Sequence, residues 1–107
     1  MKLFIANTSK QAYRFAFRMP ETGRIIELPV AIGGQILALD ADKTVIDAAI
    51  EHHAIYGMKS VQEARSAQGF VGQVYSVDKE ISGDLIATNF IDNDVIKWYI
   101  AKFLRHF

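Results

Sequence analysis

The sequence predicts an α+β fold: an antiparallel sheet of four to five strands with two to three helices packed on one face. Short apolar or alternating segments fill roughly the first 40 residues, which is typical of consecutive antiparallel strands. Near residue 45 the apolar period changes to that of a helix. No linker or repeat divides the 107 residues, so residues 1–107 are predicted to form a single domain.

The first two predicted strands differ in pattern. Residues 2–6 are apolar and end at a turn-forming run, Asn7-Thr8-Ser9-Lys10. Residues 12–18 alternate with period two, which predicts a half-buried strand. Its aromatic face is Tyr13, Phe15 and Phe17, and its opposite face is Ala12, Arg14, Ala16 and Arg18.

Two further strands are predicted over residues 24–30 and 35–39, with the Gly33-Gly34 turn between them. Pro29 lies near the end of the first of these segments. Because proline cannot donate a ladder hydrogen bond, this segment is expected at a sheet edge or at a bulge.

A helix is predicted over residues 45–56. Thr44 and Asp47 have the spacing of an N-capping pair, and Gly57 is a natural left-handed C-cap. The apolar stripe recurs with helical spacing and consists of Ile46, Ala49, Ile50 and His53.

The rest of the chain is mixed. Residues 58–68 are expected to be a loop with at most a short helical turn, and residues 70–77 a strand with a bulge or close backbone approach at Gly72. Ser82 can cap a short helix over about 83–90. A second C-terminal helix starts near residue 92, with an apolar stripe formed by Ile96, Tyr99, Ile100, Phe103 and Phe107.

Composition excludes several classes of function. Lys+Arg and Asp+Glu both number 12, so the formal net charge of +0 makes nucleic acid an unlikely partner. No apolar run approaches the roughly 18 residues that a membrane span needs. The chain has 0 cysteines, which excludes disulfides and thiolate metal sites. The N-terminus turns polar too early for a secretory signal.

No set of residues predicts catalysis. The adjacent His52 and His53 point about 100° apart on a helix and cannot share one metal ion. His53, on the apolar stripe, is expected to be a hydrogen-bonded core histidine, and His52 a surface residue. The acids around the start of this helix lack the glycine and terminal glutamate of a calcium loop. We therefore expect no enzyme activity, metal or cofactor.

The candidate sites are surfaces. Arg14 and Arg18 form either a solvated strand face or a basic patch for an acidic protein. The last helix is aromatic beyond its stripe, which favours a partner or homodimer interface. The predicted partner-binding residues are Arg14, Arg18, Trp98, Lys102 and Arg105. The alternatives are a self-assembling structural subunit, or a small-ligand or nucleotide-binding module using Arg14, His53, Tyr56 and Tyr75.

The run Phe4-Ile5-Ala6-Asn7-Thr8-Ser9-Lys10-Gln11 resembles the opening of small proteins of Mu-like transposable phages and related mobile elements. The runs Gly33-Gly34-Gln35, Tyr56-Gly57 and residues 69–79 are similar too, so the likeness covers about residues 1–80. The resemblance implies a phage accessory protein in a bacterial cytoplasm and no particular activity. We expect a non-enzymatic protein that binds a bacterial or phage protein, for example to inhibit a host defence complex.

Overall fold

The computed structural model describes residues 1–66 and 71–87 and confirms the α+β fold class. The first four strands begin and end within about a residue of the predicted boundaries, because their patterns are local. The elements, in chain order, are β1 (Lys2–Asn7), β2 (Tyr13–Arg18), β3 (Ile25–Val30), β4 (Gln35–Asp40), α1 (Lys43–Ala54), β5 (Lys59–Ser60), α2 (Val61–Ser66) and β6 (Gln73–Val77), followed by a short helix over residues 83–87.

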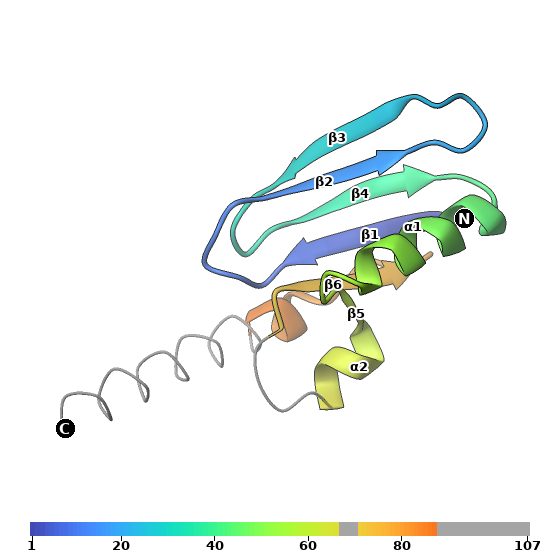
Figure 1. The fold of residues 1–107 in the computed structure, drawn as a ribbon. Helices are drawn as coiled ribbons and strands as arrows, with labels where there is room; N and C mark the ends of the chain where they lie inside the picture. Colours follow the sequence, from blue (N-terminus) through green and yellow to red (C-terminus); the bar gives the residue numbers. More distant parts are fainter. Residues whose placement is uncertain (67–70, 88–107) are drawn as a thin grey trace, which may run out of the picture.

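The strands form two sheets, a four-stranded sheet in the order β4-β1-β6-β5 and a separate β2–β3 hairpin (Figure 1). Strand β1 is antiparallel to both β4 and β6, and only the two-residue β5 pairs in parallel, with β6. The sequence did not predict this parallel pair, because two residues carry no recognisable period.

Strand β1 is buried on both faces. Leu3 and Ile5 point to a core shared with α1 and the hairpin, whereas Ala6 points to a second core with Val74. The first core consists of Leu3, Ile5, Phe15, Phe17, Val30, Ala38, Leu39, Val45, Ile46, Ala49 and Met58. The second consists of Ala6, Ala64, Val71, Val74, Ile81, Leu85 and Ile86.

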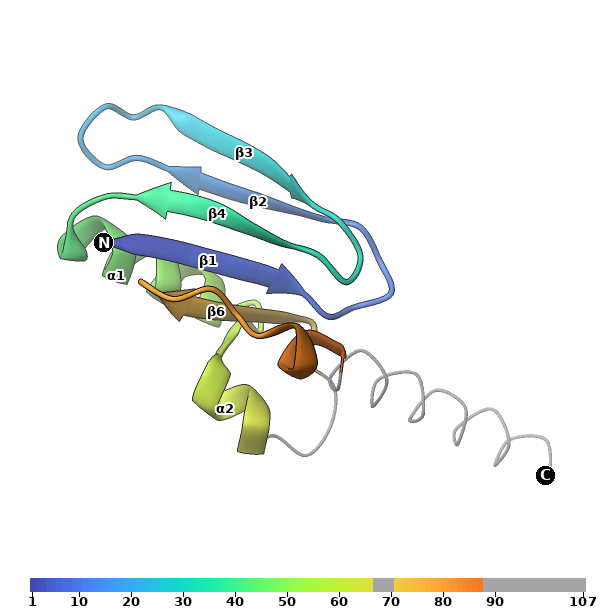
Figure 2. The same cartoon turned by 180° about the vertical axis from the view of Figure 1, so that it is seen from behind.

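Helices cover both sides of the four-stranded sheet. The sequence predicted that the helices pack together on one face. Helix α1 packs on the face that is in front in Figure 1. The helix over residues 83–87 packs on the other face, as the view from behind shows (Figure 2), because Leu85 and Ile86 belong to the second core.

Helix α1 begins at Lys43, two residues earlier than predicted. Asp42 is its N-cap residue without a side-chain cap hydrogen bond, so the predicted Thr44–Asp47 capping pair is wrong. Asp47 instead accepts a hydrogen bond from the Lys43 ammonium at 2.6 Å, one helical turn away. Of the predicted apolar stripe, Ile46, Ala49 and His53 are buried and Ile50 is half-buried, and Gly57 adopts the predicted left-handed conformation at φ 93°.

Residues 58–68, expected to be largely loop, contain α2 within their described part. A reciprocal capping box starts this helix: the Ser60 hydroxyl accepts from the Glu63 N–H, and the Glu63 carboxylate accepts from the Ser60 N–H, both at 3.1 Å. These hydrogen bonds to the carboxylate, the main-chain one above all, lower the pKa of Glu63.

The later elements follow the prediction with shifted bounds. Strand β6 begins at Gln73, so Gly72 lies before it, where its carbonyl accepts from the Thr8 N–H at 3.0 Å. Ser82 caps the short helix through the Leu85 N–H at 3.2 Å, as predicted. The predicted helix from residue 92 onward lies outside the described residues.

Candidate functional site

The β2–β3 hairpin has one buried and one exposed face, as its period predicts. Phe15 and Phe17 are buried in the first core. The register pairs Arg14 with Pro29, Ala16 with Glu27, and Arg18 with Ile25. We call these six residues the outer face. All of them are exposed, so the predicted position of Arg14 and Arg18 on a solvated face is confirmed.

The turn of the hairpin shows which backbone groups point outward. The Met19 N–H donates to the Arg24 carbonyl at 2.8 Å, so these residues continue the ladder as a hydrogen-bonded pair. Hydrogen-bonded and non-hydrogen-bonded pairs alternate along an antiparallel ladder. The outer-face residues therefore form the non-hydrogen-bonded pairs, and their backbone N–H and C=O groups point away from the partner strand. Pro29 occupies such a position and costs the ladder no hydrogen bond.

His53 covers one carbonyl on the free edge of β2. The Nε2 atom of His53 lies 3.1 Å from the Ala16 carbonyl oxygen, and its Nδ1 atom lies 2.7 Å from the Ala49 carbonyl oxygen. The Phe15 ring stacks on the imidazole with centroids 4.7 Å apart. A neutral imidazole donates to one of these carbonyls and the imidazolium to both. The prediction of a hydrogen-bonded core histidine is confirmed, and its partner Ala16 joins α1 to β2.

Strand β3 has a free edge that no other described element pairs with. We call its outward backbone groups the β3 edge: the N–H and C=O groups of Ile25 and Glu27 and the carbonyl of Pro29. A hollow of about 580 Å³ is lined by Met19, Thr22, Arg24, Ile25, Ile26 and Glu27. Consecutive strand residues point to opposite faces. A hollow bordered by all of residues 24–27 must therefore lie along the edge of the strand.

The charges around the β3 edge leave an excess of positive charge. Arg14 forms an exposed ion pair with Glu27, with Nη1 and Oε2 3.4 Å apart. Within residues 1–66 and 71–87, neither Arg18 nor Arg24 has an ion pair. A group that approaches this edge therefore meets the guanidinium groups of Arg18 and Arg24, which are not ion-paired within the described residues. Ile25 beside them is 54% exposed.

A smaller hollow of about 260 Å³ adjoins the same surface on the α1 side. It is lined by Ala16, Phe17, Arg18, Ile25 and His52. His52 is exposed, as predicted, and its ring lies 5.9 Å from that of Tyr56. Tyr56 and its neighbour Ile55 are among the most exposed large apolar residues described. The end of α1 therefore extends the apolar part of the surface beside β2.

The residues of the alternative small-ligand site lie in different settings. Arg14 is ion-paired with Glu27, His53 is buried on two carbonyls, and Tyr56 is exposed at the end of α1. Tyr75 packs against the first core, and burial, followed by the Glu63 and Asp47 charges, raises its pKa. Among the described residues, no side-chain hydrogen bond, ion pair or ring contact joins any two of these four.

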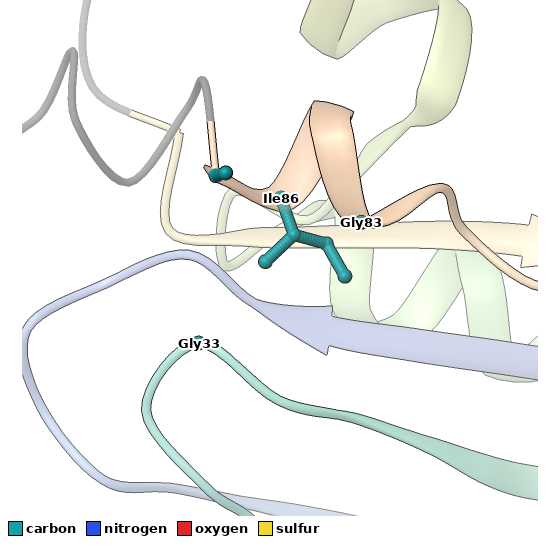
Figure 3. A pocket seen from close by; sticks show the side chains of 4 residues that line it. Gly33, Gly83 and Ile86 are labelled. Carbon is teal, nitrogen blue, oxygen red and sulfur yellow. The ribbon is translucent and has the colours of Figure 1, made fainter.

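A third hollow lies between the β3–β4 turn and the last described helix (Figure 3). Gly33, Gly83, Ile86 and Ala87 line its volume of about 200 Å³. None of these side chains carries a charge or a polar group, so this hollow offers nothing to orient a polar ligand.

The part of the chain that the structure describes holds neither a metal-binding cluster nor a helix that could span a membrane. No group of three His, Cys, Asp or Glu residues could hold a metal ion there. No helix of those residues is long and apolar enough to cross a membrane. The predicted contact residues Trp98, Lys102 and Arg105 lie outside the described residues.

Comparisons of the chain with protein-family models, curated proteins and solved structures find no match. The sequence predicted Arg14 and Arg18, with Arg24 just after the turn, but missed Ile25 and Glu27 as members of the same surface. The one signal that could have pointed to them was Pro29, which marks β3 as an edge strand. The geometry of the hairpin therefore defines the candidate surface.

Proposed function

We propose that this protein acts by binding another protein through the outer face of the hairpin and the adjoining β3 edge. The observation that carries the proposal is an exposed Ile25 beside the uncompensated Arg18 and Arg24. Arginine and large apolar side chains are typical anchors of protein interfaces. The positive excess favours an acidic partner.

Several finer features belong to the same proposal. The resemblance to proteins of Mu-like phages suggests a bacterial or phage partner in a bacterial cytoplasm, such as a defence complex that the protein inhibits. Trp98, Lys102 and Arg105 are proposed as a second contact region and as the candidate homodimer surface. Binding without catalysis is proposed because the residue types predict no nucleophile with its base.

Affinity capture from a bacterial lysate tests the proposal. The wild-type protein is expected to retain a partner that the double variant Arg14→Glu, Arg18→Glu loses. A matched control is Arg65→Glu with Lys79→Glu, which changes the net charge equally at two exposed positions elsewhere. Recovery of no partner, or equal retention by both double variants, would contradict the proposal.

A further inference from the structure

Building on the proposed function, we infer that the partner supplies an extended acidic segment that adds to the β3 edge as a further strand of the hairpin sheet. The inference goes beyond a basic patch because it specifies main-chain pairing on one edge and the charge of the segment. Main-chain hydrogen bonds supply the affinity in this mode, and alternate side chains supply specificity.

The two edges of the hairpin are not equivalent. On β2, the outward carbonyl of Ala16 is engaged by His53 of α1. On β3, the outward N–H groups of Ile25 and Glu27 have no main-chain partner among the described residues, and the ladder assigns none to them. An unpaired strand edge of this kind is a template for another strand.

Pro29 limits the length of the pairing. It offers a carbonyl but no N–H, so the donors of the β3 edge end at Glu27. Pairing therefore centres on residues 25–27, which all border the hollow of about 580 Å³. A short edge ended by proline also protects against open-ended aggregation.

Charge selects the added segment. Arg24 borders the hollow directly, and Arg18 lies opposite Ile25 on the outer face. The carboxylate of Glu27 is already engaged by Arg14 at 3.4 Å and adds little repulsion toward an acid. Carboxylates of an added strand thus meet unpaired guanidinium groups, whereas a basic strand meets repulsion.

The probe for the test is a short labelled peptide of alternating Glu and Val, with a Lys and Val peptide as its counterpart. Binding is measured by fluorescence anisotropy, and the amide signals of Ile25 and Glu27 are followed by NMR. The Glu and Val peptide is expected to bind and to shift these two amides more than those of Ile26 and Leu28, because the latter already donate within the hairpin.

Two variants of Ile25 separate the contribution of its backbone N–H to binding from that of its side chain. Ile25→Pro removes an outward N–H at the first residue of a strand, where proline is tolerated, and Ile25→Ala removes the side chain but keeps the N–H. We expect Ile25→Pro to bind about fivefold more weakly than Ile25→Ala, the value of roughly one net hydrogen bond. Circular dichroism shows whether both variants keep the fold, and Glu27→Pro against Glu27→Gln repeats the comparison at the second outward N–H.

Three outcomes would overturn the inference: equal binding of the Lys and Val peptide, equal weakening by alanine and proline, or a concentration-dependent dimer that Ile25→Pro abolishes. The dimer would show that a second copy occupies the edge. Lysate capture separates the two proposals. If Arg14→Glu with Arg18→Glu abolishes capture and Ile25→Pro leaves it intact, the proposed function stands and strand addition fails.

Discussion

Strands β1 and β3 have six residues each but opposite surroundings. Strand β1 has a neighbour on each side and a core on each face, with Leu3, Ile5 and Ala6 at 0% exposure. Strand β3 has one paired neighbour and one partly buried face, on which only Val30 is fully buried. Strand β1 therefore stabilises the fold through both of its faces. Strand β3 keeps an exposed face and an unpaired edge, which a partner can bind.

The largest expected effect is the difference in the free energy of unfolding between alanine variants of two isoleucines. Ile5→Ala in β1 should lower the free energy of unfolding by about 3–4 kcal/mol, since it leaves a cavity between packed elements. Ile25→Ala on the outer face should lower it by about 0.5 kcal/mol or less. Urea unfolding of both variants measures the difference. Similar losses at the two positions would show that the outer side of β3 is covered.

The next effect concerns Asn7 at the end of β1. Its buried amide group donates to the Gln11 carbonyl at 2.8 Å and the Val30 carbonyl at 3.1 Å, and its side-chain oxygen accepts from the Ser9 N–H at 3.0 Å. Asn7→Ala should cost about 2–3 kcal/mol because buried partners lose their hydrogen bonds. Gln11→Ala, which keeps its backbone carbonyl, should stay within about 0.5 kcal/mol of the wild type by the same unfolding measurement.

A smaller loss of stability is expected when the contact between His53 and the free edge of β2 is removed. His53→Phe keeps an aromatic ring against Phe15 but leaves the Ala16 carbonyl without its partner. We expect a loss of about 1–2 kcal/mol in the free energy of unfolding. The adjacent His52→Phe, at an exposed position, is the control. If both variants were equally stable, the contact between His53 and the Ala16 carbonyl would not stabilise the fold.

The smallest expected effect is a pH dependence of the local stability at Glu63, in helix α2. Hydrogen bonds lower the pKa of Glu63 in the folded protein, so its contribution is present above the ordinary pKa of the carboxyl group. It is lost as the pH falls through the lowered pKa. The protection of the Glu63 amide, relative to its intrinsic exchange rate at each pH, should fall on acidification in the wild type. Glu63→Gln should remove this local dependence while β3 stays unaffected.

The local part of the fold could be predicted from the sequence. Period two in residues 12–18 gave β2 and the exposed position of Arg14 and Arg18, and the helical stripe gave α1 with a buried His53. The reciprocal Ser60–Glu63 capping box was also legible in the sequence, as a serine followed three residues later by a glutamate, but the surrounding polar run obscured it.

The rest depends on contacts between distant residues. Strand β1 pairs with β6, some seventy positions along the chain, and no local pattern encodes that choice. Asn7 looked like an ordinary turn residue, although its side chain reaches Val30. The contact between His53 and Ala16, 37 positions apart, distinguishes the two edges of the hairpin, and no local pattern encodes it either.

Amide hydrogen exchange along β3 in the free protein shows whether the β3 edge is open. If the β3 edge is open, the amides of Ile25 and Glu27 exchange fast, whereas those of Ile26 and Leu28, which donate to β2, are protected. Uniform protection of all four amides would mean that the edge is already paired, and would contradict the account.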